Sequence, residues 1–340
     1  MILVTGSGGL IGSEAARFYL AKGAEVVGID NNSRERFFGP GGSVMSSINH
    51  LLEYDHYTHI DQDITDHQAM QEVFKKYGSD INLIIHTAAQ PSHDWSALDP
   101  HLDFSVNAIG TMHLLELFRQ HCPKATFIFT STNKVYGDNP NTLLKYEEGE
   151  TRYSPIGVDA IDESLSIDNC VHSPFGASKV AGDVMCQEYG KYFDLNVGVF
   201  RGGCLTGPNH KGVELHGFLS YLVKCAKKGT PYTVYGYKGK QVRDNIHSRD
   251  LISCFEEFRK APRKGEAYNI GGGLKANCSI IEAVSQIEDL LDKKMDFSVS
   301  DKNRVGDHIW YVSDLSKFKS HYPEWNQEYD LTRTLKEMCE

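Results

Sequence analysis

Short apolar runs alternate with amphipathic segments along the first 200 residues. The apolar runs predict strands at 1–5, 25–29, 57–60, 81–86, 125–130 and 195–200, and helical periodicity predicts helices at 13–22, 66–77, 99–121 and 176–193. Apolar runs without a polar face are typical of strands that are buried on both sides of a parallel sheet. The pattern therefore predicts an α/β fold, a Rossmann-type doubly wound parallel sheet.

The alternation is interrupted twice. Residues 31–56 and 139–172 are polar and show no clear period, so we expect long irregular loops there, which are usually functional or mobile. After Arg201 the sequence becomes rich in Gly, Pro and His, with one further helix expected at about 213–228. This change of texture predicts a second, smaller α+β domain.

A glycine-rich turn lies between the first predicted strand and the first predicted helix, Thr5-Gly6-Ser7-Gly8-Gly9-Leu10-Ile11-Gly12. Glycines let the backbone approach a pyrophosphate, and the N–H groups at the helix start, here those near Leu10 and Ile11, favour an anion. Asp30 ends the second strand, where a carboxylate binds ribose hydroxyls and repels a 2′-phosphate. We therefore predict NAD as the cofactor, although Arg34 nearby would suit NADP. The alternative is a glycine turn with a capping Asp30.

Composition narrows the class of protein. The 340 residues are 40 % hydrophobic and 24 % charged, as in a globular chain, and a net charge of −10 disfavours a nucleic-acid partner. No apolar run reaches the roughly 18 residues of a membrane span, and the first residues lack the basic region of a signal peptide. The 8 cysteines are scattered without a CxxC pair, which favours reduced thiols in the cytoplasm over a disulfide framework or a structural metal. We predict no metal site.

Further motifs follow the glycine turn, and together they cover nearly the whole chain. They are Asp63-Ile64, His86-Thr-Ala-Ala-Gln90, Asn107, Thr130-Ser-Thr-Asn-Lys-Val-Tyr-Gly137, Ser173-Pro-Phe-Gly-Ala-Ser-Lys179, Arg243-Asp-Asn-Ile-His247 and Arg304-Val-Gly-Asp307. In this order they resemble the extended short-chain dehydrogenase/reductase family, specifically its nucleotide-sugar epimerases and dehydratases.

This resemblance implies roles for individual residues and domains. It adds to the predicted cofactor contacts of Gly6, Gly9, Leu10, Ile11, Gly12 and Asp30 those of Asn31, Asn32, Asp63, Ile64, Ala88, Ala89, Gln90, Asn107 and Lys179. It implies an NAD-binding Rossmann domain at 1–200 plus about 238–262, and a nucleotide-sugar-binding domain at about 201–237 plus 263–340. The helices at 99–121 and 176–193 correspond to those through which family members form homodimers.

The catalytic motif departs from the family at one position. The resemblance implies that Thr132 hydrogen-bonds the reacting oxygen and that Lys179 favours the phenolate of a tyrosine four residues earlier, but that position is Phe175. Either a tyrosine has been replaced here, or another base serves, or the protein binds without turnover. Candidate bases are His93 and Asp94, on the loop after the fourth strand, and Cys204, just past the sixth. The alternative for each is a polar loop residue or a buried structural thiol.

The residues after Thr132 bear on the reaction. Sugar 4,6-dehydratases carry an Asp-Glu pair there, whereas this chain has Asn133-Lys134, which cannot supply a carboxylic acid. The string Ser-Thr-Asn-Lys-Val-Tyr-Gly-Asp is similar to that of the CDP-paratose 2-epimerases, also called CDP-tyvelose 2-epimerases. The resemblance implies epimerisation at C2 of a CDP-deoxyhexose, with a UDP-sugar 4-epimerase, another nucleotide-sugar oxidoreductase, or a silent NAD and nucleotide-sugar binder as alternatives.

Substrate contacts are predicted at six positions. The resemblance implies substrate contacts by Gln90, at the end of the cofactor-lining stretch, and by Asn133 and Lys134, and Arg201, Arg243 and Arg304 supply cations. Arginine presents paired donors that match phosphate oxygens, so Arg243 and Arg304 are expected to bind the diphosphate. The alternative for these arginines is a salt bridge at the surface.

Overall fold

The computed structural model describes residues 1–214, 216–300 and 306–340. Contacts divide the chain into two units. The first comprises Met1–Val135, Pro174–Arg201 and Ile252–Tyr268, and the second comprises Tyr136–Ser173, Gly202–Leu251 and Asn269–Glu340. These boundaries differ from the expected ones in three places. Residues 136–173 and about 238–251 were expected in the first domain but belong to the second unit. Residues 263–268 were expected in the second domain but belong to the first unit.

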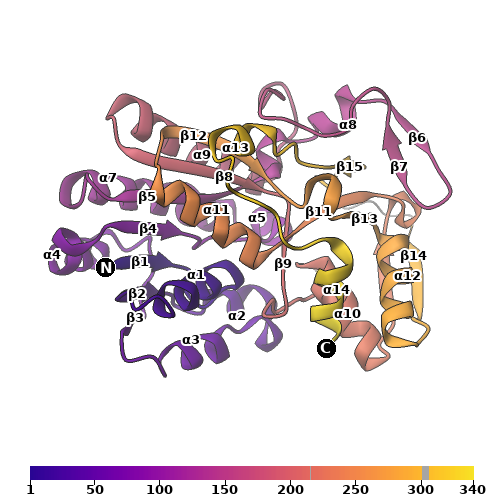
Figure 1. Cartoon of the computed structure of the whole chain (residues 1–340), viewed down its shortest axis with the longest axis horizontal. Coiled ribbons are helices and arrows are strands. Elements are labelled where there is room, and N and C mark those ends of the chain that lie inside the picture. Colours follow the sequence, from indigo (N-terminus) through magenta and orange to yellow (C-terminus); the bar gives the residue numbers. More distant parts are fainter. Residues whose placement is uncertain (215, 301–305) are drawn as a thin grey trace. The chain divides into compact units, whose positions relative to one another are not determined.

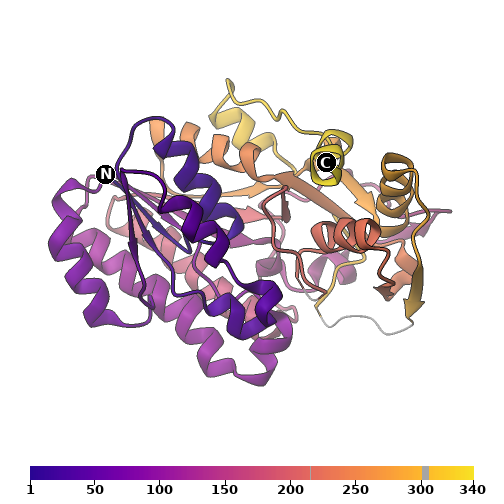
Figure 2. The ribbon, with the colours of Figure 1, turned by 90° about the horizontal axis from the view of Figure 1, so that it is seen from below.

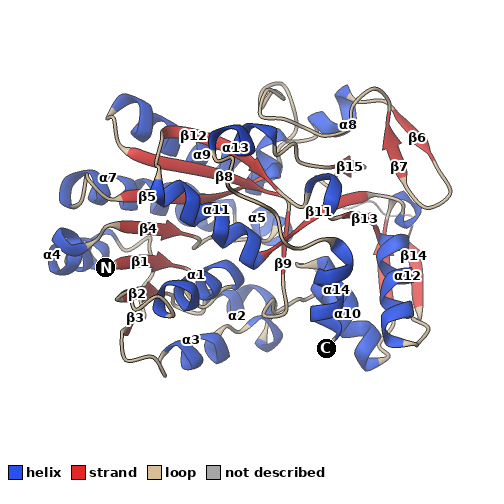
Figure 3. Ribbon diagram, in the orientation of Figure 1, coloured by secondary structure: helices blue, strands red, loops and turns tan. Residues whose placement is uncertain are grey.

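A seven-stranded sheet in the order β12-β8-β5-β4-β1-β2-β3 organises the first unit (Figures 1 and 3). Its strands are β1 (Ile2–Thr5), β2 (Val26–Ile29), β3 (Tyr57–Ile60), β4 (Leu83–His86), β5 (Thr126–Thr132), β8 (Asn196–Gly202) and β12 (Lys264–Ile270). Parallel ladders join β1 to β2 and β4, β2 to β3, and β4 to β5. The predicted Rossmann-type sheet is confirmed. Its strand order reverses between β1 and β4, and such a switch point opens a ligand crevice at the carboxyl ends of the strands.

Helices cover both faces of this sheet. The helices formed wholly or mostly by residues of the first unit are α1 (Leu10–Leu20), α2 (Ser33–Phe38), α3 (Met45–Leu51), α4 (His67–Tyr77), α5 (His93–Leu98), α6 (Pro100–Phe104), α7 (Thr111–His121), α9 (Ser173–Tyr192) and α11 (Ser248–Lys260). In Figure 2 the indigo α1 lies on one side of the strands, and the purple α4 and α7 lie on the other. Apolar side chains of α4, α7 and α9 pack on the strands, among them Phe74, Leu114 and Phe118, which are at most 1 % exposed.

Several predicted helices differ in their bounds. The segment expected as a helix at 99–121 is helical from Pro100 to His121, where α6, a π-helical turn at Ser105–Gly110 and α7 follow one another without a gap, and the Asp99 side chain caps the start by accepting from Leu102 N–H. The helix expected at 213–228 is α10 (Phe218–Lys228), because Gly217 precedes it with a φ of 80°. Conversely, α1 begins at Leu10 rather than at residue 13.

The two segments expected to be irregular contain regular elements, so that expectation is wrong in part. Residues 31–56 hold α2 and α3, and residues 139–172 hold α8 (Asn139–Leu143) and a hairpin of β6 (Tyr146–Glu148) and β7 (Tyr153–Pro155). Helices of six or seven residues complete fewer than two full turns, so a 3.6-residue apolar period has no room to become visible.

The second unit is built on a small sheet in which β11 (Val242–His247) is central. It pairs with β9 (Cys204–Thr206), β13 (Asn277–Ser279) and β15 (Trp310–Tyr311), and this pairing explains why the segment around residue 242 leaves the first unit. A second pair joins β10 (Tyr232–Tyr235) to β14 (Phe297–Ser300). Helices α10, α12 (Ile280–Leu291) and α14 (Leu331–Cys339) share one apolar core, and α13 (Ser316–His321) also belongs to this unit.

Candidate functional site

The glycine turn after β1 forms a cradle that only glycine can build. Gly6 has a φ of 70°, and a Cβ on it would lie 2.7 Å from Ala88 N, in the loop after β4. A Cβ on Gly12 would lie 2.0 Å from the Gly6 carbonyl oxygen. Helix α1 begins directly behind this turn, and no side chain caps its N-terminus at Gly9. The first N–H groups of a helix have no partner within it, so the turn suits a pyrophosphate.

Polar side chains after β2 and β3 meet beside the glycine turn. The carboxylate of Asp30 accepts from the backbone N–H of Gly8 at 2.9 Å and of Asn32 at 2.8 Å. The Asn31 amide donates to Asp63 at 3.0 Å. Burial raises the pKa of Asp30, while the two backbone donors oppose that rise. Four residues predicted to contact the cofactor are thus brought together at the carboxyl edge of the sheet.

A buried amide pair fixes the loop after β4. Gln90 N–H donates to the Asn107 side-chain oxygen at 2.9 Å, and the Asn107 amide donates to Gln90 O at 3.1 Å. Asn107 also donates to Asp103 and to Ser178, each at 3.1 Å, which links the π-helical turn to α9. Sequence reasoning missed Asp103 and Ser178, although Asp103 lies four residues before Asn107, a spacing that places both on one helix face.

Helix α9 carries Phe175 and Lys179 one turn apart. The Lys179 ammonium donates to Thr130 O at 3.0 Å and lies 4.4 Å from the centre of the Phe129 ring. Burial lowers the pKa of Lys179 to about 8. The Phe175 ring is 8 % exposed, and its centre lies 4.6 Å from that of the His93 ring at the start of α5. The His93 ring therefore lies against Phe175, the residue at the position where the sequence resemblance leads one to expect a tyrosine.

The other catalytic candidates lie in different surroundings. Thr132 ends β5, and its hydroxyl accepts from Lys134 N–H at 3.2 Å, which closes a 3₁₀ turn at Asn133–Tyr136. Asp94 follows His93 and is exposed. Cys204 is half-buried on β9 in the second unit, opposite Asn245 of β11.

The predicted substrate arginines differ in their partners. Arg243 contacts Asp307 at 2.5 Å and also donates to Val242 O at 2.8 Å. Arg201 is buried in the first unit, where Asp183 accepts two of its hydrogen bonds. Arg304 lies outside the described residues. Among the described residues no three His, Cys, Asp or Glu side chains are grouped to hold a metal ion.

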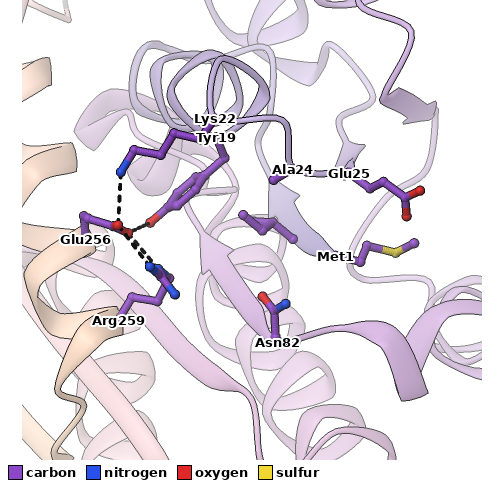
Figure 4. A pocket seen from close by; sticks show the side chains of 9 residues that line it. Met1, Tyr19, Lys22, Ala24, Glu25, Asn82, Glu256 and Arg259 are labelled. Atoms are coloured by element: carbon purple, nitrogen blue, oxygen red, sulfur yellow. Dashed lines mark hydrogen bonds and ion pairs between the residues drawn. The ribbon is translucent and has the colours of Figure 1, made fainter.

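A cavity of about 420 Å³ opens elsewhere on the first unit, where Ile2, Glu25 and Asn82 lie near the amino ends of β1, β2 and β4 (Figure 4). At its edge the Glu256 carboxylate accepts from the Tyr19 hydroxyl and the Lys22 ammonium, each at 3.1 Å, and contacts Arg259 at 2.7 Å. These charged groups satisfy one another, and none of the predicted site residues lines the cavity.

The sequence is similar to a family of known proteins and to individual members of it. Residues 2–271 match the NAD dependent epimerase/dehydratase family. The chain is 33 % identical over 324 residues to CDP-paratose 2-epimerase of Salmonella typhi, covering 93 % of this chain and 91 % of that protein. It is 28 % identical over 344 residues to dTDP-glucose 4,6-dehydratase of Haemophilus influenzae, covering 97 % and 89 %.

A solved structure is similar over nearly the whole chain. It is that of a tyrosine-to-phenylalanine mutant of UDP-glucuronic acid 4-epimerase from Bacillus cereus, in complex with UDP-4-deoxy-4-fluoro-glucuronic acid and NAD. The TM-score is 0.80 at 26 % identity, and the match covers 98 % of this chain and 96 % of that one. Within the described residues, no helix has the length and apolar character that a membrane crossing requires.

Proposed function

Because the chain belongs to the NAD dependent epimerase/dehydratase family, we propose that it is a nucleotide-sugar epimerase acting at C2 of a CDP-deoxyhexose, the CDP-paratose/CDP-tyvelose pair. The observation that carries the reaction type is the turn after Thr132, where Asn133 and Lys134 offer no carboxylic acid to expel water from a sugar. The 33 % identity to a CDP-paratose 2-epimerase supports the substrate.

The chain's residues fit NAD. A Cβ at Gly6 or Gly12 would collide with the backbone of Ala88 or of Gly6, so glycine at these positions lets the turn pack directly against the start of α1, whose first N–H groups suit a pyrophosphate. When bound, NAD takes up a hydride from a sugar carbon and returns it. In this proposal the remaining cofactor contacts are those predicted from the sequence: Leu10 and Ile11 N–H at the pyrophosphate, Asp30, Asn31 and Asn32 at the adenosine ribose, Asp63 and Ile64 at the adenine, and Ala88, Ala89, Gln90, Asn107 and Lys179 toward the nicotinamide.

Thr132 and Lys179 serve the reacting hydroxyl in this proposal. The Thr132 hydroxyl hydrogen-bonds the sugar oxygen, and the Lys179 ammonium supplies positive potential near it while orienting the ribose. Phe175 has no ionisable group, so it cannot accept the hydroxyl proton. The proton acceptor is therefore one of His93, Asp94 and Cys204.

The diphosphate and sugar are bound by the polar residues predicted for them. Arg243 and Arg304 bind the diphosphate. Gln90, Asn133 and Lys134 contact the sugar. Arg201 was predicted as a further contact, but its two hydrogen bonds to Asp183 favour a structural role.

Two experiments test the proposed function: identification of the small molecules bound to the purified protein, followed by an activity assay with candidate nucleotide sugars. Mass spectrometry of molecules released from the purified protein identifies the bound nucleotide. NAD-loaded protein is then incubated with CDP-paratose, CDP-tyvelose, UDP-glucose, UDP-glucuronic acid and dTDP-glucose. We expect interconversion of the two CDP sugars without accumulation of NADH. Conversion of a UDP sugar alone would contradict the CDP assignment, and a dehydrated product from dTDP-glucose would contradict the reaction type.

Two alternatives each have an observation in their favour. The structural similarity to a UDP-glucuronic acid 4-epimerase favours a UDP-sugar 4-epimerase or another nucleotide-sugar oxidoreductase. Phe175, buried where the family tyrosine stands, favours a protein that binds NAD and nucleotide sugar without turnover. Such a binder would retain both ligands and release neither epimer.

We also propose a homodimer and a cytoplasmic location. Phe104 and Met112, on the segment that includes α6 and α7, and Val184 on α9 are 46 %, 39 % and 37 % exposed, so the two helices that correspond to the dimer helices of the family each expose apolar side chains. All eight cysteines lie among the described residues and none forms a disulfide, as is typical of a reducing compartment. Light scattering of the purified protein tests the dimer.

A further inference from the structure

The site described above lacks a proton acceptor at the position the family uses. Epimerisation through a ketone requires that the sugar hydroxyl lose its proton, and a positioned side chain accelerates that transfer by about 10²–10⁴-fold. Phe175 occupies that place on α9, one turn before Lys179, and its ring is 8 % exposed.

An imidazole lies against this phenyl ring. The centres of the His93 and Phe175 rings are 4.6 Å apart and their planes are inclined by 54°, which is direct ring contact. Histidine exchanges a proton near neutral pH. We propose that His93 accepts the proton of the sugar hydroxyl, and so replaces the phenol that Phe175 lacks. This inference rests on the proposed epimerase function.

Hydrogen bonds hold the loop that carries His93. The Gln90 amide clamps Ser92, donating to its carbonyl at 2.9 Å and accepting from its N–H at 2.5 Å. The Ser92 hydroxyl in turn accepts from Trp95 N–H at 3.2 Å and caps α5, whose first residue is His93. A catalytic group needs such support, because small misplacements lower the rate sharply.

The same network reaches the turn that carries Phe175. Asn107 joins Gln90 to Ser178 on α9, and the Ser178 hydroxyl donates to Phe175 O at 2.9 Å. Gln90, Asn107 and Ser178 are each at most 1 % exposed. His93 and Phe175 are therefore fixed relative to each other by a continuous set of buried hydrogen bonds within the first unit.

The other candidates have weaker geometry. Asp94 is exposed at the second position of α5, whereas the ring of its neighbour His93 is in contact with Phe175. Cys204 is a half-buried thiol on β9, opposite Asn245 of β11, and a buried cysteine commonly has a structural role. Lys179 already donates to Thr130 O, which suits it to supply charge rather than to accept a proton.

The proton transfer to His93 accompanies the loss of hydride from the sugar carbon. The sugar O–H bond breaks, an N–H bond forms on the imidazole, and the electron pair left on oxygen becomes the second bond of a carbonyl as the hydride of that carbon passes to the NAD that the proposed function supplies. On return the imidazolium gives the proton back while the carbon regains its hydride on the other face. The ring ends as it began, and no further oxidant or reductant is consumed.

Three variants and a matched control test the assignment on the NAD-loaded protein. They are His93→Gln, Phe175→Tyr, the double variant of both, and His101→Gln, which makes the same change at an exposed histidine on α6. With CDP-paratose we expect His93→Gln to lower kcat by at least 100-fold with KM and NAD content unchanged. The double variant should recover at least tenfold over His93→Gln, because the restored phenol takes over the proton. His101→Gln should match the unmodified protein.

A second readout does not depend on turnover. In side-chain ¹⁵N–¹H spectra of the NAD-loaded protein, the His93 ring resonances, assigned by their loss in His93→Gln, should shift when CDP-paratose is added. Thermal unfolding of His93→Gln at the same temperature as the unmodified protein establishes that the variant is folded, and His93→Asn replaces it if it is not.

Each outcome decides one question. Unchanged kcat in His93→Gln, or His93 resonances that do not move with the sugar bound, overturns the His93 assignment and leaves the epimerase function standing. Turnover in Phe175→Tyr but none in the unmodified protein also overturns it and supports a silent binder. Absence of turnover of every sugar in both proteins overturns the epimerase function, and the His93 assignment with it.

Discussion

Asp183 holds Arg201 at two points inside the first unit. Arg201 Nε and Nη2 donate to the two carboxylate oxygens at 3.0 and 2.9 Å, and both side chains are at most 6 % exposed. Ser131 and Gln187 donate to the same carboxylate at 2.6 and 2.7 Å. The pair links β8 to α9 and to the end of β5, the strand that carries Thr132. It therefore stabilises the elements on which Thr132 and Lys179 lie.

Removing the charge of Asp183 should therefore destabilise the protein. Asp183→Asn leaves the Arg201 guanidinium buried beside a neutral amide, and breaking a buried pair in this way costs about 3–5 kcal/mol of the free energy of unfolding. Urea denaturation measures the change. Asp55→Asn, the same change at an exposed site, should stay within about 0.5 kcal/mol. Equal stability of the two variants would contradict a supporting role for the pair.

Lys179 should make stability depend on pH in the alkaline range. Burial lowers its pKa from 10.5 to about 8, so between those values the folded chain has released a proton that the unfolded chain still holds. Stability then rises with pH across this window. Below pH 8 the fold carries a buried charge, and Lys179→Met should raise the free energy of unfolding there, by at most about 3 kcal/mol.

The comparison of thermal unfolding at pH 7 and pH 10 isolates this effect. The advantage of Lys179→Met over the unmodified protein should shrink as pH rises, because the unmodified lysine becomes neutral. An advantage that stays constant with pH would show that burial of the charge is not its source. Turnover should fall at both pH values in this variant, since the ammonium is part of the proposed site.

Gly12→Ala should abolish NAD binding. Its Cβ would lie 2.0 Å from the Gly6 carbonyl oxygen, so the turn and α1 must separate, which displaces the N–H groups proposed for the pyrophosphate. Fluorescence titration with NADH measures the loss. Gly23→Ala is the control: its φ of 77° also disfavours a side chain, by about 1 kcal/mol, but nothing lies within 4 Å of the added atom. NADH binding by Gly12→Ala with the affinity of Gly23→Ala would contradict the cradle.

Arg243→Lys should weaken binding of CDP by about ten- to hundredfold. A lysine keeps the charge but loses the planar paired donors that match a diphosphate, a difference of roughly 1.5–3 kcal/mol. Calorimetric titration with CDP measures it, and Arg259→Lys at the separate cavity of the first unit should bind CDP normally. An unchanged affinity in Arg243→Lys would argue that Arg243 serves only its contact with Asp307.

The predicted strands and the cofactor turn follow from local sequence, and the places where prediction failed share a physical cause. The short helices α2 and α3 end before a 3.6-residue period becomes visible. The helix expected at 99–121 is present, but its π-helical turn at Ser105–Gly110, where the Asn107 amide donates to Gln90 of another loop, has no period that the sequence displays. The domain boundary near residue 242 depends on which strands β11 pairs with, and pairing between distant segments leaves no local signal.

The sequence by itself determined the fold class, the family and the cofactor, because these rest on glycine spacing, apolar period and Asp30, all within short stretches of chain. It also revealed that Phe175 lacks a hydroxyl. Only the tertiary structure decided what stands beside that ring: His93, held by Gln90, Asn107 and Ser178. The tertiary structure likewise showed that Arg201 donates two hydrogen bonds to Asp183. Contacts between side chains that are far apart in sequence are fixed by the packing of the sheet and its helices. A local period or motif therefore does not predict an individual contact of this kind.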